Sequence, residues 1–322
     1  MDSGQKIAPL FSVIIPLYNK ADTIARTVRS VVAQTFNDWE LIVVNDGSTD
    51  DSLSVAKQLS KDIPMRIIDK PNGGVSSARN AGAEVAVGRY IALLDGDDAW
   101  HSCHLRYISE AIDSYPTVGL FGCGYEKHSN NWRYFTIPWG GCRIADVYAI
   151  FRFGQPINSS TVAIRRDLWE KVRGFNEQLS FYEDYEFFFR LGLYTKCCVV
   201  RKISGIYYDD AKEQATKRHR ELSKSTRPQL AFVDERIRDG TASHQMVVFA
   251  GTQLGIILCN AYLKNLTPLA KHISDLFPNV VAACPMLGRM GRERRLLTVL
   301  YSYLFLAYYK IRCHMIVWRK HE

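Results

Sequence analysis

The sequence predicts an α/β fold: a mostly parallel sheet flanked by helices, followed by a helical C-terminal region. Over residues 11–100, short apolar runs typical of strands buried on both faces alternate with helical patterns. Polar turns rich in Asp, Asn and Gly separate them, as expected where a strand leads into a helix. A strand, helix, strand, helix order at this spacing requires right-handed crossovers, and these produce parallel strands.

Length and composition agree with a globular enzyme-sized protein. The 322 residues suffice for one large α/β domain and a smaller appendage, and 47% hydrophobic with 23% charged residues excludes a disordered chain. Eight cysteines are scattered without a C-x-x-C pair or zinc-ligand spacing. The N-terminus has no basic region followed by an apolar core, so we expect no signal peptide and a cytoplasmic location with reduced thiols.

Four strands are expected in the first hundred residues. The first covers residues 11–15 and is expected to end at Pro16, because a central strand does not tolerate a proline further in. The others are expected at residues 41–44, 65–68 and 90–94, where apolar and β-branched side chains form short runs.

Polar residues follow each of these strands. Ligands of parallel α/β sheets bind beyond the carboxyl ends of the strands, which places residues 16–19, 45–47, 72–74 and 95–98 on one rim. This rim offers an acidic group after the second strand, an arginine on the helix after the third and an acidic cluster after the fourth. A nucleotide requires a base contact, a ribose contact and a neutralised diphosphate. We therefore expect the rim to bind a nucleotide.

The acidic cluster after the fourth strand consists of Asp95, Asp97 and Asp98, with Gly96 between them. Three carboxylates within four residues repel one another and resist burial, so they need a compensating charge. A divalent cation that bridges to phosphate supplies it, and hard oxygen ligands suit Mn²⁺ or Mg²⁺. Taken alone, Asp-Gly is equally a turn signal; the convergence of four polar segments on one rim favours the metal interpretation.

Four stretches carry a resemblance to a known family: SVIIPLYNKADTIARTVRSVVAQTF, ELIVVNDGSTDDS, NGGVSSARNAG and YIALLDGDDAW. The chain resembles the family 2 glycosyltransferases, and VAIRRDLWEKVRGFNEQLSFYEDYEFFFRL is similar to their acceptor-side half. The resemblance implies the Rossmann-like GT-A fold. It also implies inverting, metal-assisted transfer of a hexose from a nucleotide-sugar, with a UDP-sugar expected, to a hydroxyl of a glycan or glycolipid. This reaction belongs to polysaccharide biosynthesis.

The resemblance also implies roles for individual residues. The expected nucleotide-binding residues are Pro16, Tyr18, Asn19, Asp46, Asn72, Arg79, Asp95 and Gly96. Pro16 and Tyr18 would line a uracil pocket, and Asp46 would accept a hydrogen bond from the base, which offers a donor there. Arg79 would contact base or phosphate, and Asp95 would hold the ribose.

The metal and the catalytic base complete the implied site. Asp97 is expected to ligate the metal, while Asp98 either shares that role or orients a metal-bound water. Asp184 is expected to be the general base, with Glu183 orienting it, because displacement at the anomeric carbon needs a base opposite the departing diphosphate. Without the preceding RGFNE stretch, two acids here would also be ordinary for a helix N-terminus.

The resemblance fades after about residue 205, which suggests a division of the chain. Residues 1–206 are the expected catalytic domain, with a nucleotide-binding half at about 11–100 and an acceptor half at about 101–206. Residues 207–228 are highly charged and form either a solvated linker or a flap over the diphosphate. Residues 229–322 are expected to be helical.

The last part of the chain has the features of a membrane-surface helix. The formal net charge of the whole chain is +8, and arginines flank residues 296–318, a nearly continuous apolar and aromatic run. Lys310, Arg312 and His314 interrupt that run, and charges deep in hydrocarbon are costly. An interfacial helix on an anionic membrane fits best, ahead of a buried bundle helix and a membrane span. We expect a peripheral location on the cytoplasmic face.

Other functions fit the sequence less well. A nucleotidyltransferase of this fold would need a Gly-rich, Lys-containing loop after the first strand, and a phosphohydrolase would need an aspartate nucleophile where residues 16–18 lie. A catalytically inactive sugar-nucleotide-binding protein or membrane adaptor would not need Asp97 and Asp184. The absence of a Gln-x-x-Arg-Trp motif argues against a processive synthase. The expected partners are a nucleotide-sugar donor, a glycan or lipid-linked acceptor and an anionic membrane surface, and no nucleic acid.

Overall fold

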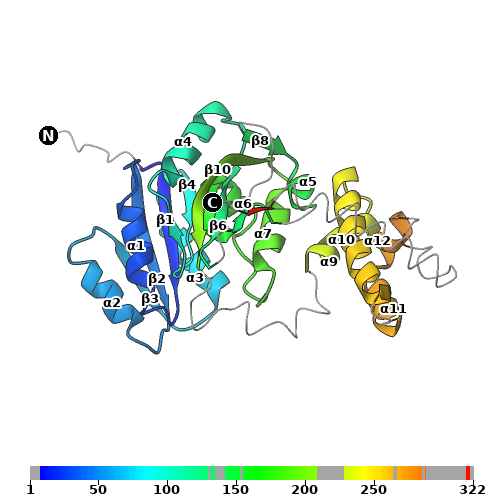
Figure 1. Cartoon of the computed structure of the whole chain (residues 1–322), viewed down its shortest axis with the longest axis horizontal. Coiled ribbons are helices and arrows are strands. Elements are labelled where there is room, and N and C mark those ends of the chain that lie inside the picture. The colour runs from blue at the N-terminus through cyan, green and yellow to red at the C-terminus, as the bar shows by residue number, and fades with distance from the viewer. Residues whose placement is uncertain are drawn as a thin grey trace.

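The structure is a computed structural model, shown in Figure 1. It describes residues 8–129, 132–134, 142–152, 155–208, 228–263, 267–284, 287 and 317–319. The strands are β1 (Phe11–Leu17), β2 (Trp39–Asp46), β3 (Arg66–Lys70), β4 (Tyr90–Leu93), β5 (Ala99–Trp100), β6 (Leu120–Lys127), β7 (Trp132–Tyr134), β8 (Cys142–Ala145), β9 (Val162–Arg165), β10 (Cys197–Tyr207) and β11 (Val317–Arg319). The helices are α1 (Ile24–Val32), α2 (Ser52–Leu59), α3 (Val75–Glu84), α4 (His104–Ser114), α5 (Val147–Phe151), α6 (Arg166–Lys171), α7 (Glu183–Leu191), α9 (Pro228–Arg238), α10 (His244–Leu263), α11 (Thr267–Leu276) and α12 (Pro278–Ala283).

One mixed sheet runs through the molecule in the order β11-β7-β6-β9-β4-β1-β2-β3. Its first half, β3-β2-β1-β4, is parallel throughout, as the alternation of strands and helices predicts. Strand β9 lies antiparallel between β4 and β6, and β10 runs parallel to β6. The predicted α/β class and mostly parallel sheet are therefore confirmed, and β9 joins the two halves of the sheet.

The prediction that the first strand ends at Pro16 is wrong. Strand β1 continues to Leu17, and Pro16 pairs in register with Val44 of β2. The proline is tolerated because of the side toward which it points. The carbonyl of Ile14 accepts from Leu94, so Pro16, two residues on, also faces the β4 side, where β4 has already ended at Leu93. The residue pairing between β1 and β4 ends at Ile14, so the N–H that proline lacks falls beyond this ladder.

Both faces of the sheet are covered by helices. Val13, Ile15 and Val43 face one side and share a core with α1 and α4. Ile14 and Ile91 face the other side, where α3 and α7 pack. The alternation along β1 is the period-2 pattern of a strand, and burial on both faces explains its uniformly apolar sequence.

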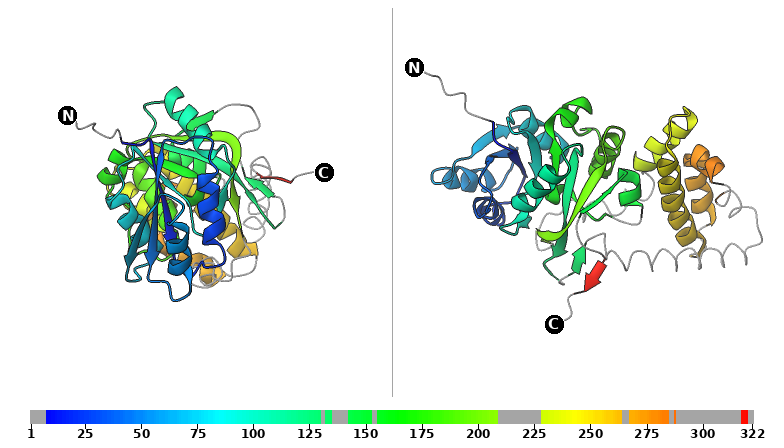
Figure 2. Two further views of the ribbon diagram at one scale, coloured as in Figure 1. Left: turned by 90° about the vertical axis from the view of Figure 1, so that its left-hand side faces the viewer. Right: turned by 90° about the horizontal axis from the view of Figure 1, so that it is seen from above.

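The C-terminal helices share the core of the second face. Phe249 of α10 is buried and meets Phe189 of α7 edge to face, with ring centroids 4.7 Å apart. Figure 2 shows α10, α11 and α12 grouped at one end of the molecule, beyond α7. Within the region predicted to be helical, the apolar residues 246–263 form most of α10.

Two predicted segments lie outside the described residues: most of the charged stretch 207–228, and the apolar run 296–318 up to residue 316. Among the helices that the structure describes, none has the length and apolar character of a membrane span.

The turn that precedes α3 is held by the end of β2. Asp46 is 2% exposed, and its carboxylate accepts from the backbone N–H groups of Gly73 at 2.9 Å and Gly74 at 2.7 Å. The ammonium of Lys70 lies 2.6 Å from the same carboxylate. Gly74 has φ of +89°, a left-handed conformation that favours glycine. A buried anion thus fixes the turn through charge-assisted hydrogen bonds.

We predict that Asp46→Asn lowers the free energy of unfolding by about 1.5–3 kcal/mol, the usual contribution of hydrogen bonds to a charged group. The amide removes the charge and replaces one acceptor oxygen by a donor that faces N–H groups. Urea denaturation without nucleotide measures the effect. Asp51→Asn, at an exposed position, is the control and should change stability by less than about 0.5 kcal/mol. Equal stability of the two variants would show that Asp46 does not hold the turn.

Candidate functional site

A cavity of about 840 Å³ opens at the carboxyl ends of the parallel strands, between the turn before α3 and the start of α7. The predicted site residues that line it are Pro16, Tyr18, Asp46, Asn72, Arg79, Asp95, Gly96, Asp97, Asp98, Glu183 and Asp184. The structure therefore brings together both acidic centres that the sequence places far apart. The cavity lies at the rim predicted for parallel sheets.

Asn19 is the one predicted residue that does not line this cavity. Its side-chain oxygen accepts from the N–H of Thr49 at 2.9 Å, and its own N–H donates to the Ser48 hydroxyl at 3.2 Å. Its φ of +50° is left-handed, a conformation that asparagine tolerates better than most residues. Asn19 therefore fastens the end of β1 to the turn after β2.

Arg79 connects the two acidic centres. Its guanidinium, 2% exposed, donates to Asp95 at 2.7 Å and to Glu183 at 3.2 Å. Burial alone would lower the pKa of Arg79, but the two carboxylates raise it above its ordinary value. The arginine is thus held as a cation between the end of β4 and the first residue of α7.

Asp95 is held by neighbouring side chains and still lines the cavity. Besides Arg79 it accepts from the Ser159 hydroxyl at 3.0 Å, while its backbone N–H donates to the Ser160 hydroxyl at 3.2 Å. Burial would raise the pKa of Asp95, but Arg79 and these hydroxyls hold it below the ordinary value. Asp95 is therefore an anion whose position is fixed from two sides.

Asp97 and Asp98 have different environments. The Asp97 side chain is 17% exposed, lines the cavity and lies 2.6 Å from the ammonium of Lys20. Asp98 is 2% exposed and accepts from the Ser160 hydroxyl at 2.5 Å and the N–H of Tyr208 at 3.1 Å. Burial and the nearby carboxylates of Asp97 and Asp95 raise the pKa of Asp98 well above its ordinary value. Asp97 is the more accessible of the two to an ion in the cavity.

The carboxylate of Asp97 suits a divalent cation. The lysine beside it shows that this oxygen accommodates a positive charge at short distance. Among the described residues, no group of three or more His, Cys, Asp or Glu side chains is arranged to hold a metal. Mg²⁺ is usually bound by one or two carboxylates together with waters and substrate phosphates, and one cavity-facing aspartate fits that mode.

Asp184 has the environment of a proton acceptor. Its carboxylate accepts from the Gln155 amide at 2.6 Å and from the N–H of Tyr185 at 2.8 Å. Burial raises its pKa to about 7, the charge of Glu183 contributes in the same direction, and Arg79 opposes both. A carboxyl group that ionises near neutral pH is suited to general-base work.

Lys20 and Gln155 are among the polar residues of the cavity that sequence reasoning missed. Lys20 follows the predicted Tyr18 and Asn19, so its place on the same rim was a usable signal. Gln155 lies in an irregular segment and contacts Asp184, which is 29 residues away in sequence. No periodic pattern indicates that contact.

Aromatic side chains surround the cavity near Asp184: Tyr125, Phe181, Tyr182, Tyr185 and Tyr207. Tyr182 directly precedes α7 and has a left-handed φ of +59°. An aromatic residue in this conformation is unusual, and such strain concentrates at functional sites.

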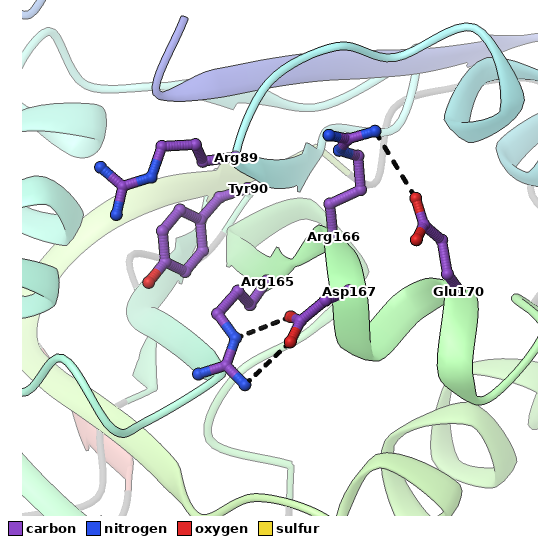
Figure 3. A pocket seen from close by; sticks show the side chains of 6 residues that line it. All are labelled: Arg89, Tyr90, Arg165, Arg166, Asp167 and Glu170. Atoms are coloured by element: carbon purple, nitrogen blue, oxygen red, sulfur yellow. Dashed lines mark hydrogen bonds and ion pairs between the residues drawn. The ribbon is translucent and has the colours of Figure 1, made fainter. Parts of the chain in front are cut away.

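A second cavity, of about 260 Å³, lies at the opposite end of β4, where Tyr90 pairs with Arg165. Figure 3 shows two ion pairs among its charged side chains, Arg165 with Asp167 at 2.7 Å and Arg166 with Glu170 at 3.5 Å. This cavity is much smaller than the first and most of its charged side chains are paired with each other, so the first cavity is the candidate site.

Comparisons with solved structures support the fold. The chain is similar to residues 1–349 of S. aureus TarS in complex with UDP-GlcNAc, with a TM-score of 0.61, 18% identity, and coverage of 94% of this chain and 87% of that one. It is also similar to the mannosyltransferase PcManGT from Pyrobaculum calidifontis in complex with GDP-Man and Mn²⁺, with a TM-score of 0.58, 16% identity, and coverage of 97% and 86%. At these identities the likeness shows the GT-A fold alone.

Relatives in sequence include EpsJ of Bacillus subtilis (strain 168), an uncharacterized glycosyltransferase, at 39% identity over 131 residues. The hyaluronan synthase of Pasteurella multocida is 33% identical over 202 residues. These matches cover 40% and 59% of this chain, and 38% and 19% of the respective relatives. The chain therefore corresponds to less than half of either relative.

The family model for glycosyl transferase family 2 matches residues 12–173, half of the chain. The match contains the β1 to β4 rim and the acidic cluster, and it stops ten residues before Glu183. Sequence match, fold and cavity agree. This chain belongs to the family 2 glycosyltransferases.

Proposed function

We propose that the protein transfers a sugar from a UDP-sugar to a hydroxyl acceptor with inversion, assisted by Mn²⁺ or Mg²⁺. The observation that carries the proposal is the cavity itself, which is lined both by the accessible Asp97 near the strand ends and by Asp184 of α7, whose pKa is raised to about 7. An inverting displacement needs these two separated acidic functions.

The donor would lie along the β1 to β4 rim. Pro16, Tyr18 and Asp46 would meet the base, and Asp95 would accept from the ribose. The Asp46 carboxylate already accepts from Gly73, Gly74 and Lys70. It still has acceptor capacity, because a carboxylate offers about four lone-pair sites. TarS with UDP-GlcNAc and PcManGT with GDP-Man show that proteins of this fold bind both nucleotides. A donor screen should therefore include UDP- and GDP-sugars.

Asp97 would hold the cation together with the donor diphosphate. When bound, the cation supplies positive charge to the departing diphosphate. Lys20, beside Asp97, adds a second positive group on the same rim. Asp98 is buried and bonded to Ser160 and Tyr208, so its proposed role is to shape the cluster.

The acceptor would approach from the α7 side. Its hydroxyl oxygen attacks the anomeric carbon, the bond from that carbon to the diphosphate oxygen breaks, and Asp184 takes the hydroxyl proton. The aromatic lining of this side suits the apolar faces of sugar rings, which supports a glycan or lipid-linked glycan as acceptor.

We predict that Asp97→Ala abolishes Mn²⁺-dependent UDP binding while the fold survives, because the residue lies at a partly exposed rim. Asp98→Asn is the matched variant and should retain metal-dependent binding. Calorimetric titration of UDP with and without Mn²⁺ measures both. The reverse ranking would assign the cation to Asp98, and normal UDP affinity in both variants would refute the metal assignment.

We predict that Asp184→Asn reduces turnover by about 10²–10⁴-fold, the usual effect of removing a general base, with donor affinity nearly unchanged. Turnover of the parent should rise with pH through about 7, because only ionised Asp184 accepts a proton. Released nucleotide diphosphate is the readout. Glu186→Gln, on the same helix but paired with Arg190, is the control and should retain activity. An active Asp184→Asn variant would transfer the role to Glu183.

We also propose that the enzyme is peripheral on the cytoplasmic face of a membrane, supported by the basic and aromatic composition of residues 289–322. The full chain should float with vesicles that contain anionic lipid, and high salt should release part of it. Removal of residues 289–322 should abolish flotation. A full chain that ignores anionic vesicles would contradict this proposal.

A further inference from the structure

Gln155 contacts the proposed base from outside α7. Its amide nitrogen lies 2.6 Å from Oδ2 of Asp184, a short hydrogen bond. An ionised carboxylate only accepts, so the amide must present its NH₂ group to Asp184. The opposite oxygen, Oδ1, accepts from the backbone N–H of Tyr185. The two donors together fix the plane of the carboxylate.

The backbone of Gln155 is itself restrained. Its carbonyl oxygen accepts from the hydroxyl of Tyr125 on β6 at 3.3 Å. The next residue is Pro156, which disfavours helical conformations at the residue before it. Gln155 and Asp184 both line the cavity. Tyr125 of β6 therefore restrains the backbone of Gln155, and the side-chain amide of Gln155 contacts Asp184.

The charged groups around Asp184 come from two other directions. Glu183, its neighbour on α7, carries a like charge that opposes ionisation of Asp184. Arg79 of α3 approaches Glu183 at 3.2 Å and is itself shared with Asp95 of β4. Lys127 of β6 lines the same cavity. In contrast to these charged side chains, Gln155 contacts Asp184 through a neutral amide.

We propose that Gln155 is a positioning residue for the base: its amide orients the Asp184 carboxylate in the cavity and, with Arg79 neutralising Glu183, stabilises its ionised form. This inference rests on the proposed function, in which Asp184 accepts the acceptor's proton. The role of Gln155 differs from that of Glu183. The neutral amide of Gln155 donates a hydrogen bond that favours the ionised form of Asp184, whereas the second carboxylate, Glu183, disfavours it.

The test measures ionisation of Asp184 directly and needs no substrate. The full-length protein is labelled with ¹³C at the aspartate carboxyl carbons, and their chemical shifts are followed from pH 4 to 9. The Asp184 signal is the one missing from Asp184→Asn. In Gln155→Leu its pKa should rise by about one to two units, the size expected for the loss of a hydrogen bond to a charged group. Gln155→Glu should raise it further, because a like charge replaces a donor of the same size.

Gln178→Leu is the matched control, since Gln178 lines the same cavity and its change should leave the Asp184 titration unchanged. Once a donor and acceptor are known, the acidic limb of the turnover profile should move to higher pH in Gln155→Leu by the same amount. An Asp184 signal that titrates alike in Gln155→Leu and the parent overturns the inference. Retained turnover in Asp184→Asn would instead transfer the role of the base to Glu183, and would leave the titration result standing.

Discussion

The rest of the site depends on the two ion pairs that the buried guanidinium of Arg79 makes. A charge placed in the protein interior is costly unless it is paired, and Arg79 is paired twice, with Asp95 from the end of β4 and Glu183 from the start of α7. These two elements belong to different halves of the catalytic fold. Loss of the arginine would leave two acids facing each other beside a third, Asp184. The same ion pairs therefore join the halves and permit several carboxylates to share one cavity.

The aspartates around Arg79 differ in their burial and in their hydrogen-bond partners. Asp46 accepts from backbone N–H groups and lysine and fixes a turn, whereas Asp98 is buried against a hydroxyl and an N–H. Asp97 faces the cavity with a lysine beside it, and Asp184 accepts from a neutral amide. Identical side chains thus differ in burial, hydrogen bonding and nearby charge within one cavity, and these are the properties that suit them to different tasks.

Much of the fold and the composition of the site could be predicted from the sequence. The parallel strands follow from apolar runs and crossovers, and their ends necessarily meet at one rim, so the acidic cluster and Asp46 were placed correctly on the cavity. The end of β1 was misplaced, because the tolerance for Pro16 depends on where a neighbouring strand stops. The contact between Arg79 and Glu183 spans 104 residues, and that between Gln155 and Asp184 has no periodic pattern. Such contacts arise from tertiary packing, which local patterns do not encode.

The edge-to-face contact between Phe189 and Phe249 has a consequence for chimeric enzymes. The helix that carries Glu183 and Asp184 presents its buried aromatic side to α10, so the surface behind these two acids is completed by the C-terminal helices. A graft that exchanged only these helices with those of another family member would leave Phe189 against a foreign surface. Such a graft would disturb the orientation of the two acids without altering a residue that lines the cavity. A chimera that is to keep the shape of this cavity therefore requires α7 and α10 to be transferred as one unit.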